Sequence, residues 1–113
     1  MKKIEAIIRP EKLDDVKHAL AEKGYLGLNI VGVTGRGVQK GIVHAGRGGQ
    51  AYSVDMLPKV KLEVVVTDKN TDEVVTIIQK SAWTGNIGDG KIFVLNVEEA
   101  VRVRTGERGE IAV

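Results

Sequence analysis

Residues 84 to 94 read Thr84-Gly85-Asn86-Ile87-Gly88-Asp89-Gly90-Lys91-Ile92-Phe93-Val94 and join a helical pattern to an apolar strand. Glycines let backbone N–H groups approach phosphate oxygens, and a lysine adds a positive charge, so this stretch indicates an anion-binding loop. Gly85 and Gly90-Lys91 have phosphate-loop spacing, but Ile92 stands where an NTPase has Ser or Thr for magnesium, and a strand follows rather than a helix. The stretch therefore predicts nucleotide binding without the usual machinery for hydrolysis. Taken alone, its glycines fit a helix end and a turn equally well.

The composition of the whole chain narrows its class. A length of 113 residues predicts one domain, which is small enough that oligomerisation would add to its stability. A net charge of +2 and an aromatic content of 4% disfavour a nucleic-acid binder. The lack of cysteine excludes thiolate metal clusters and thiol nucleophiles and fits the cytoplasm. Short apolar runs predict neither a signal peptide nor a membrane span, so a membrane would be met only through a partner.

The first half of the chain predicts a strand, a helix and a second strand. Residues 3–9 alternate apolar and polar positions, and Pro10 closes them. Apolar residues recur at helical spacing from Glu11, and Gly24 stands where a helix end favours a left-handed residue. Residues 25–35 are rich in β-branched side chains and predict the second strand. Glycines then interrupt the pattern between residues 37 and 57, which predicts a long loop, either a hairpin tip or an interaction arm.

The second half repeats this order. Residues 59–67 alternate as a strand, and Asn70 followed by Glu73 resembles a capping box that begins a second helix. Residues 91–97 predict a fourth strand. In residues 100–104, Arg102 and Arg104 would point to one side if the segment is extended, as a paired cationic face for phosphate oxygens. The charged, glycine-containing tail from 106 to 113 is expected to be loosely ordered.

The order β-α-β, long loop, β-α-β predicts an α+β fold of the ferredoxin-like, split βαβ kind. Its antiparallel sheet would be covered by two helices on one face. Ile7 and Val65 are apolar residues at the alternate strand positions, whose side chains face the side of the sheet without helices. That face therefore needs another cover. We therefore expect homo-oligomerisation through that face.

With these elements placed, the sequence resembles PII signal-transduction proteins, nitrogen regulatory proteins of the GlnB/GlnK type, over its entire length. The resemblance rests on four motifs, which are Gly35-Arg36-Gly37 with Gln39-Lys40-Gly41, Val54-Asp55-Met56-Leu57-Pro58-Lys59, the loop and strand from Thr84 to Val94, and Val101-Arg102-Val103-Arg104-Thr105-Gly106-Glu107. It implies a single domain over residues 1–113, with a T-loop at about 37–56, a nucleotide loop at 84–91 and a C-terminal loop at 102–113. It also implies a compact homotrimer that is a regulator and not an enzyme.

The resemblance implies ATP or ADP in each cleft between neighbouring subunits. Gly88, Asp89, Gly90 and Lys91 would line the phosphates, and Arg102 and Arg104 would reach them from the neighbouring subunit. Asn29, Glu63 and Val65 would lie near the adenine and ribose, while Gly35 and Gly37 let the loop base approach. Beside MgATP, 2-oxoglutarate would bind with Gln39 ligating magnesium and Lys59 pairing a carboxylate. The expected target is an ammonium transporter of the Amt type, gripped through the T-loop.

The sequence departs from the family pattern at three places. Val38 stands where many members use an arginine for a phosphate contact, and Asn86 stands where many have lysine. The uridylylation motif of bacterial members is altered, because the segment from Gly46 to Tyr52 is one residue longer. Tyr52 corresponds best to the modified tyrosine, but the altered tip makes modification less expected.

Other functions remain open on the residues. A paralogue acting on glutamine synthetase or nitrogenase would share every motif except the loop tip. A slow ATPase is suggested by Lys91 and the two arginines, although no motif positions a group to orient water. An RNA-binding ferredoxin-like module is disfavoured, since the first and third strands lack aromatic residues for stacking.

Overall fold

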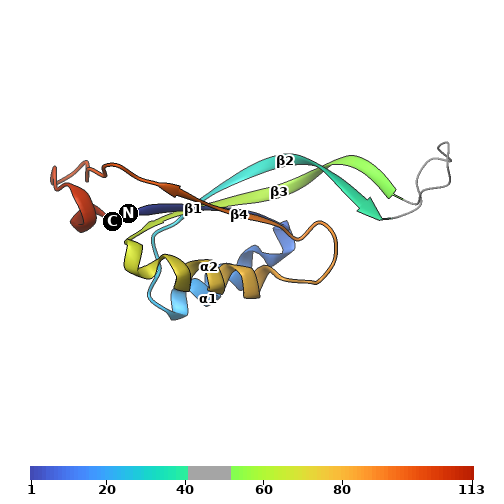
Figure 1. Ribbon diagram of the computed structural model, residues 1–113, viewed down its shortest axis with the longest axis horizontal. Helices are drawn as coiled ribbons and strands as arrows, with labels where there is room; N and C mark the ends of the chain where they lie inside the picture. The colour runs from blue at the N-terminus through green and yellow to red at the C-terminus, as the bar shows by residue number, and fades with distance from the viewer. Residues whose placement is uncertain (41–51) are drawn as a thin grey trace.

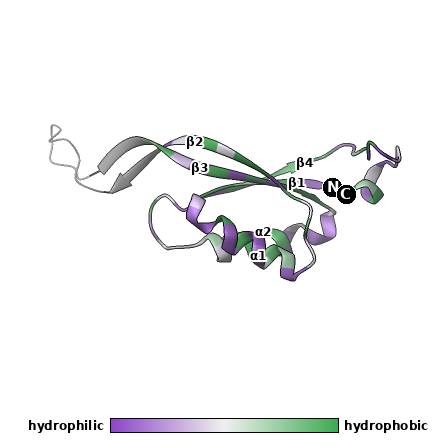
Figure 2. Cartoon of the chain, turned by 180° about the vertical axis from the view of Figure 1, so that it is seen from behind, coloured by the Kyte–Doolittle hydropathy of each residue, from purple (hydrophilic) through white to green (hydrophobic). Residues whose placement is uncertain are grey.

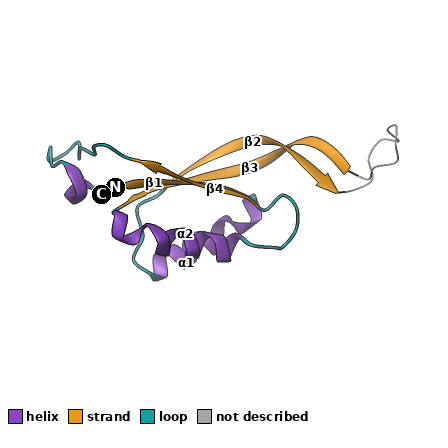
Figure 3. Cartoon of the chain, in the orientation of Figure 1, coloured by secondary structure: helices purple, strands orange, loops and turns teal. Residues whose placement is uncertain are grey.

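The computed structural model of the chain describes residues 1–40 and 52–113, and only the backbone of 37–40 and 52–55. Its elements are β1 (Lys2–Ile8), the 3₁₀ helix η1 (Pro10–Lys12), α1 (Leu13–Glu22), β2 (Asn29–Lys40), β3 (Tyr52–Val66), α2 (Asp68–Ala82), β4 (Gly90–Asn96) and the 3₁₀ helix η2 (Gly109–Ala112). The strands form one layer and the two α-helices lie beneath it as a second (Figure 3).

The sheet has the strand order β2-β3-β1-β4, and every neighbouring pair is antiparallel. Both α-helices cover the same face, as Figure 1 shows. This arrangement confirms the predicted ferredoxin-like α+β fold. It places the end of β1 beside the start of β4, because Ile8 is paired with Gly90.

The core lies between the sheet and the helices. Alternate residues of the two central strands are buried, which is the period of a strand with one covered face. They meet helix residues that recur at helical spacing. The buried set comprises Ile4, Ala6, Ile8, Val16, Leu20, Leu62, Val64, Val66, Val74, Ile78 and Ala82. Burial of each large aliphatic side chain stabilises the fold by about 1.5–3 kcal/mol.

The opposite face of the sheet has no helix over it in the described part of the chain. Figure 2 shows hydrophobic stretches in β2 and β4 as well as in the helices. On β4, Phe93 and Leu95 are 47% and 43% exposed. Such apolar positions on an uncovered face agree with the expectation that something outside this chain covers it.

The predicted long loop is wrong at both of its flanks. β2 continues to Lys40 and β3 begins at Tyr52, and these two residues are paired with each other. The ladder persists through Gly37 because backbone hydrogen bonds do not require side chains. β1 ends at the level of Val60, so beyond it β2 and β3 pair only with each other and extend from the sheet as a ribbon (Figure 1).

The second strand also begins later than predicted, at Asn29 rather than residue 25. The amide of Tyr25 donates to the carbonyl of Leu20 at 3.0 Å at the end of α1, where Gly24 has a φ of 87°. Tyr25 and Leu28 then pack against the core instead of joining the ladder. Residues 25–28 therefore connect the helix to the strand.

The predicted capping box at Asn70 is wrong. α2 begins at Asp68 with Thr67 as its N-cap, and Thr67 makes no side-chain cap hydrogen bond. Asn70 lies inside the first turn, where its amide donates to the carbonyl of Thr67. Glu73 is occupied elsewhere, since its carboxylate accepts a hydrogen bond from the Tyr25 hydroxyl at 2.6 Å.

The C-terminal segment is folded rather than extended or loose. Residues 103–105 form a turn, closed by bonds from the Gly106 amide to the Arg102 carbonyl at 2.7 Å and from the Arg102 amide to the Glu107 carbonyl at 2.8 Å. The Arg102 side chain binds the Glu107 carboxylate at 3.1 Å and the Ile111 carbonyl at 3.0 Å. The segment is therefore not extended, so the condition under which Arg102 and Arg104 would point to one side is not met, and Arg102 itself orders the tail.

Candidate functional site

The glycine loop between α2 and β4 is built around the carboxylate of Asp89. This carboxylate accepts hydrogen bonds from the amides of Thr84 at 2.7 Å and Gly85 at 2.9 Å, and from the Thr84 hydroxyl. Arg9 at the end of β1 donates its Nε to the same carboxylate at 3.0 Å. The loop is thus folded back on its own aspartate and tied to the first strand.

These donors keep Asp89 ionised. Hydrogen bonds from Thr84, and then those from Arg9 and Gly85, hold the pKa of the Asp89 carboxyl well below its usual range. Because both carboxylate oxygens are engaged inside the loop, Asp89 shapes the loop. The phosphate contacts expected of this stretch would then come from its remaining backbone amides and from Lys91.

Two cations hold the loop from the sheet side. Arg9 donates a second hydrogen bond, to the Ile87 carbonyl at 2.9 Å, and Lys59 of β3 donates to the Gly88 carbonyl at 2.6 Å. Sequence reasoning missed Arg9. The pairing of the strands reveals it. Ile8 pairs with Gly90, so Arg9, which follows Ile8, lies next to Asp89, which precedes Gly90.

Gly90 is required where the loop enters β4. Its φ is 105°, and a Cβ built there would lie 1.7 Å from the carbonyl oxygen of Ile7. No side chain fits in that space, so the glycine allows the two backbones to approach. Gly85, at a φ of 86°, lies against the ring of Trp83.

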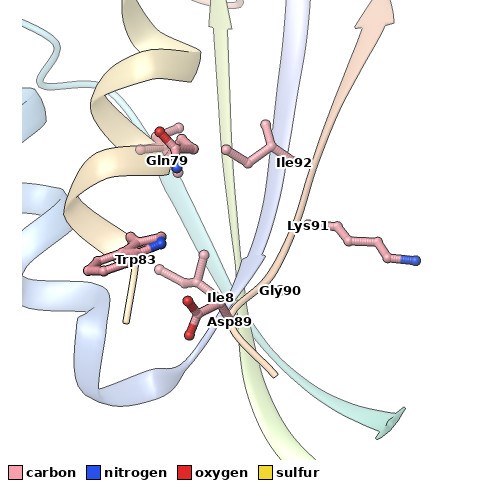
Figure 4. A pocket seen from close by; sticks show the side chains of 9 residues that line it. Ile8, Gln79, Trp83, Asp89, Gly90, Lys91 and Ile92 are labelled. Carbon is pink, nitrogen blue, oxygen red and sulfur yellow. The ribbon is translucent and has the colours of Figure 1, made fainter. Parts of the chain in front are cut away.

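A cavity of about 330 Å³ lies behind the loop on the helix side of the sheet, between α2 and β4. Its lining is largely apolar and includes Ile8, Ile78, Trp83 and Ile92. Figure 4 shows the Lys91 side chain extending away from Asp89 and Trp83. The cationic end of Lys91 therefore serves the opposite, uncovered face rather than this cavity.

The uncovered face gathers several of the predicted ligand residues. Opposite residues in antiparallel strands share a face, and the register places Asn29, Glu63, Glu5 and Phe93 in one row across the sheet. The next row toward the loop holds Lys61, Ile7 and Lys91. Lys59 and Val65 share this face by strand alternation, and Gly35 lies beside the Lys59 side chain.

The charges of this face are unevenly distributed. Lys59, Lys61, Lys91 and Arg9 lie at the end nearest the glycine loop, while Glu5 and Glu63 lie one row further along. Among residues 1–36 and 56–113, Lys91 is exposed and makes neither an ion pair nor a side-chain hydrogen bond. It is therefore available to an anion held at the loop.

The other predicted site residues lie apart from the loop. Arg102 and Arg104 follow the far end of β4, at the opposite end of the sheet from residues 84–90 (Figure 1). Gly37, Val38 and Gln39 are on the ribbon, and Tyr52 is paired with Lys40; the structure describes only their backbone. The altered segment from Gly46 to Ala51 falls outside the described residues.

The fold is an α+β ferredoxin-like domain with a glycine-rich loop at one end of an uncovered sheet face. The family model "Nitrogen regulatory protein P-II" matches residues 1–107. The chain is 56% identical to Nitrogen regulatory protein P-II 2 of Methanothermobacter thermautotrophicus, over all of this chain and 97% of that protein. It is 53% and 56% identical to the Nitrogen regulatory protein P-II of Pasteurella multocida and of Rhizobium meliloti, over the whole of both chains in each case.

The chain belongs to the P-II family of nitrogen regulatory proteins. This confirms the resemblance seen in the sequence motifs. No helix in the described part of the chain combines the length and apolar character needed to cross a membrane.

Proposed function

We propose that this protein is a homotrimeric regulator of nitrogen metabolism, without enzymatic activity, that binds ATP or ADP together with 2-oxoglutarate. Each nucleotide would lie on the uncovered sheet face, with its phosphates at residues 88–91 and its adenine and ribose toward Asn29, Glu63 and Val65. The regulated protein would be an ammonium transporter of the Amt type, bound through the T-loop in the cytoplasm at the membrane surface. A paralogue target such as glutamine synthetase or nitrogenase is the second candidate.

The chemistry of the residues fits a nucleotide. Lys91 is exposed beside a loop whose glycines turn its backbone through positive φ values. A polyphosphate is well served by a lysine and by backbone N–H groups. Magnesium would be held by phosphate oxygens and Gln39, because a hard cation prefers oxygen ligands. The bound ion would neutralise phosphate charge and bridge it to the 2-oxo acid.

The single observation that carries the proposal is the separation between Lys91 and the arginines within one chain. Arg104 lies in an exposed turn at the end of the sheet remote from the glycine loop. In an isolated chain, the cations at the loop and these arginines could therefore not contact the same nucleotide. A closed ring of copies would bring the arginines of one chain to the loop of the next.

Mixed trimers test this shared site. Lys91→Ala and Arg104→Ala should each lower ATP affinity roughly thirtyfold, since charge-assisted phosphate contacts are strong. When the two variants are co-expressed with different tags and purified as mixed trimers, some clefts receive an intact Lys91 and an intact Arg104 from different chains. Those clefts should regain wild-type affinity in calorimetry. If mixing restores none of the sites, the two residues do not meet across chains and the proposal fails.

A further inference from the structure

Glu63 is held by two lysines from different positions on the uncovered face. Lys3 of β1 binds one carboxylate oxygen at 3.0 Å, and Lys61 of β3 binds the other at 3.2 Å. The Glu63 side chain is nevertheless 19% exposed, so it remains open toward the face. A carboxylate fixed through both oxygens has a defined orientation, which a surface glutamate ordinarily lacks.

We propose that Lys61 and Lys3 are positioning residues that set the Glu63 carboxylate to accept hydrogen bonds from ribose hydroxyls, so that the site selects ribonucleotides over deoxyribonucleotides. The inference rests on the proposed nucleotide site. It adds the residues that determine sugar specificity and the reason for their arrangement.

The hydrogen-bond inventory supports this role. An ionised carboxylate only accepts, and it has about four lone-pair positions. The two lysines occupy one position on each oxygen, which leaves positions for two neighbouring hydroxyl donors. The lysines, Lys3 before Lys61, also lower the pKa of the Glu63 carboxyl, which keeps it an acceptor. A sugar lacking a hydroxyl would leave one of these acceptor positions without its donor.

The placement of Glu63 relative to Lys91 fits the length of a nucleotide. Glu63 lies one row further from the loop than Lys91 and two strands away across β1. Two strand spacings and a two-residue step separate their backbones by about 12 Å. That separation is comparable to the span from ribose to terminal phosphate. With the phosphates at Lys91, the sugar falls over the row that contains Glu63.

Lys61 gives the cleaner test of the two lysines. Lys3 also binds Glu5 at 3.2 Å, and Glu5 is directly opposite Glu63. Removing Lys3 would therefore leave two carboxylates facing each other, which destabilises a strand pair. Lys61 binds only Glu63 among the described residues, so Lys61→Met removes one positioning contact and no other ion pair.

The experiment compares the affinities of ATP, 2′-deoxy-ATP and 3′-deoxy-ATP by calorimetry with the full chain. The wild type should bind at least one deoxy analogue on the order of tenfold more weakly than ATP, because a hydrogen bond to a charged group is lost. Lys61→Met should reduce this preference to roughly threefold or less, and Glu63→Gln should abolish it. Lys61→Arg should retain it, as should Lys17→Met, a control on the exposed surface of α1.

The outcomes separate the inference from the proposed function. A merely structural role for Lys61 would weaken all three ligands equally and leave the preference unchanged, which would overturn the inference. Equal binding of ATP and both analogues by the wild type, or an unchanged preference in Glu63→Gln, would also overturn it while leaving nucleotide binding intact. Wild-type protein that binds no ATP would overturn the proposed function itself. If Lys61→Met fails to fold by circular dichroism, Glu63→Gln alone decides.

Discussion

Arg9 and Asp89, eighty positions apart in the sequence, join the end of β1 to the glycine loop through a hydrogen bond of 3.0 Å. The same arginine holds the Ile87 carbonyl, and the same aspartate holds the amides of Thr84 and Gly85. The loop is therefore ordered by its own chain before any ligand arrives. A loop ordered in this way can bind an anion through its remaining donors without an additional cost of ordering.

Replacing Asp89 should loosen the loop and weaken ATP together. Asp89→Asn should lower the free energy of unfolding by about 1–2 kcal/mol, because one acceptor becomes a donor facing other donors. It should also weaken ATP roughly tenfold by calorimetry. Asp14→Asn on exposed α1 is the matched control, with no effect on either quantity. Unchanged stability and affinity in Asp89→Asn would contradict the role given to this carboxylate.

The contribution of Asp89 should depend on pH in a defined direction. Its pKa is lower in the folded protein than in the unfolded chain, so its stabilisation is present above the unfolded value of about 3.9. It is lost as the pH falls below that value toward the folded pKa. The stability difference between wild type and Asp89→Asn should thus be constant from pH 8 to about pH 5 and shrink below about pH 4. A stability difference between the two proteins that grows as the pH falls would contradict this prediction.

Substitution of Gly90 should be far more harmful than substitution of another left-handed glycine. Gly90→Ala forces a Cβ to within 1.7 Å of the Ile7 carbonyl oxygen, so the strand pair must separate. We expect a loss of at least about 3 kcal/mol in the free energy of unfolding. Gly24→Ala, at a φ of 87° with nothing within 4 Å, should cost only about 1–2 kcal/mol. Equal losses in denaturant unfolding would show that the close approach at Gly90 is unimportant.

Tyr25 should titrate well above an ordinary tyrosine. Its hydroxyl donates to Glu73, and this hydrogen bond to a carboxylate, aided by partial burial, raises the pKa of Tyr25 to about 12. The stabilisation from this contact is present below the unfolded pKa of about 10 and is lost as the pH rises through about 12. Phenolate absorbance should show a late transition that disappears in Tyr25→Phe and moves toward pH 10 in Glu73→Gln. A single transition near pH 10 from both tyrosines would refute the contact.

The protein should be a trimer in solution. Phe93 and Leu95 lie on a sheet face without a cover in the described chain, and the proposed site needs arginines from a neighbour. Light scattering at micromolar concentration should give about 37 kDa, three times the chain mass of 12.2 kDa. Phe93→Glu should lower this mass, whereas His18→Glu on α1 should not. A monomeric wild-type mass would exclude a cleft between subunits.

Local patterns predicted the fold because they reflect burial. The alternation in residues 3–9 and 59–67 and the helical spacing around Val16 and Val74 anticipated β1, β3, α1 and α2, whose apolar sides form the core. The flanks of the long loop could not be predicted this way, since a glycine-containing strand is maintained by its partner's backbone. The cap of α2 was misplaced because Thr67 and Asn70 are both capping residues, and only packing chooses between them.

The site was predicted in part for a similar reason. Motif spacing found the glycine loop and Lys91, whose chemistry is local in sequence. Arg9 acts through Asp89, which is distant in sequence, and only the register of the sheet reveals that contact. The turn at residues 103–105 was unpredicted because it depends on Arg102 binding Glu107 and the Ile111 carbonyl.

The most direct test of the proposed regulator is calorimetric titration of 2-oxoglutarate in the presence of MgATP and, separately, MgADP. The account predicts binding with MgATP and little or none with MgADP, because the effector site needs the γ-phosphate. Gln39→Ala should abolish effector binding while leaving much of the ATP affinity. Equal binding of 2-oxoglutarate with MgADP, or wild-type binding by Gln39→Ala, would contradict the account.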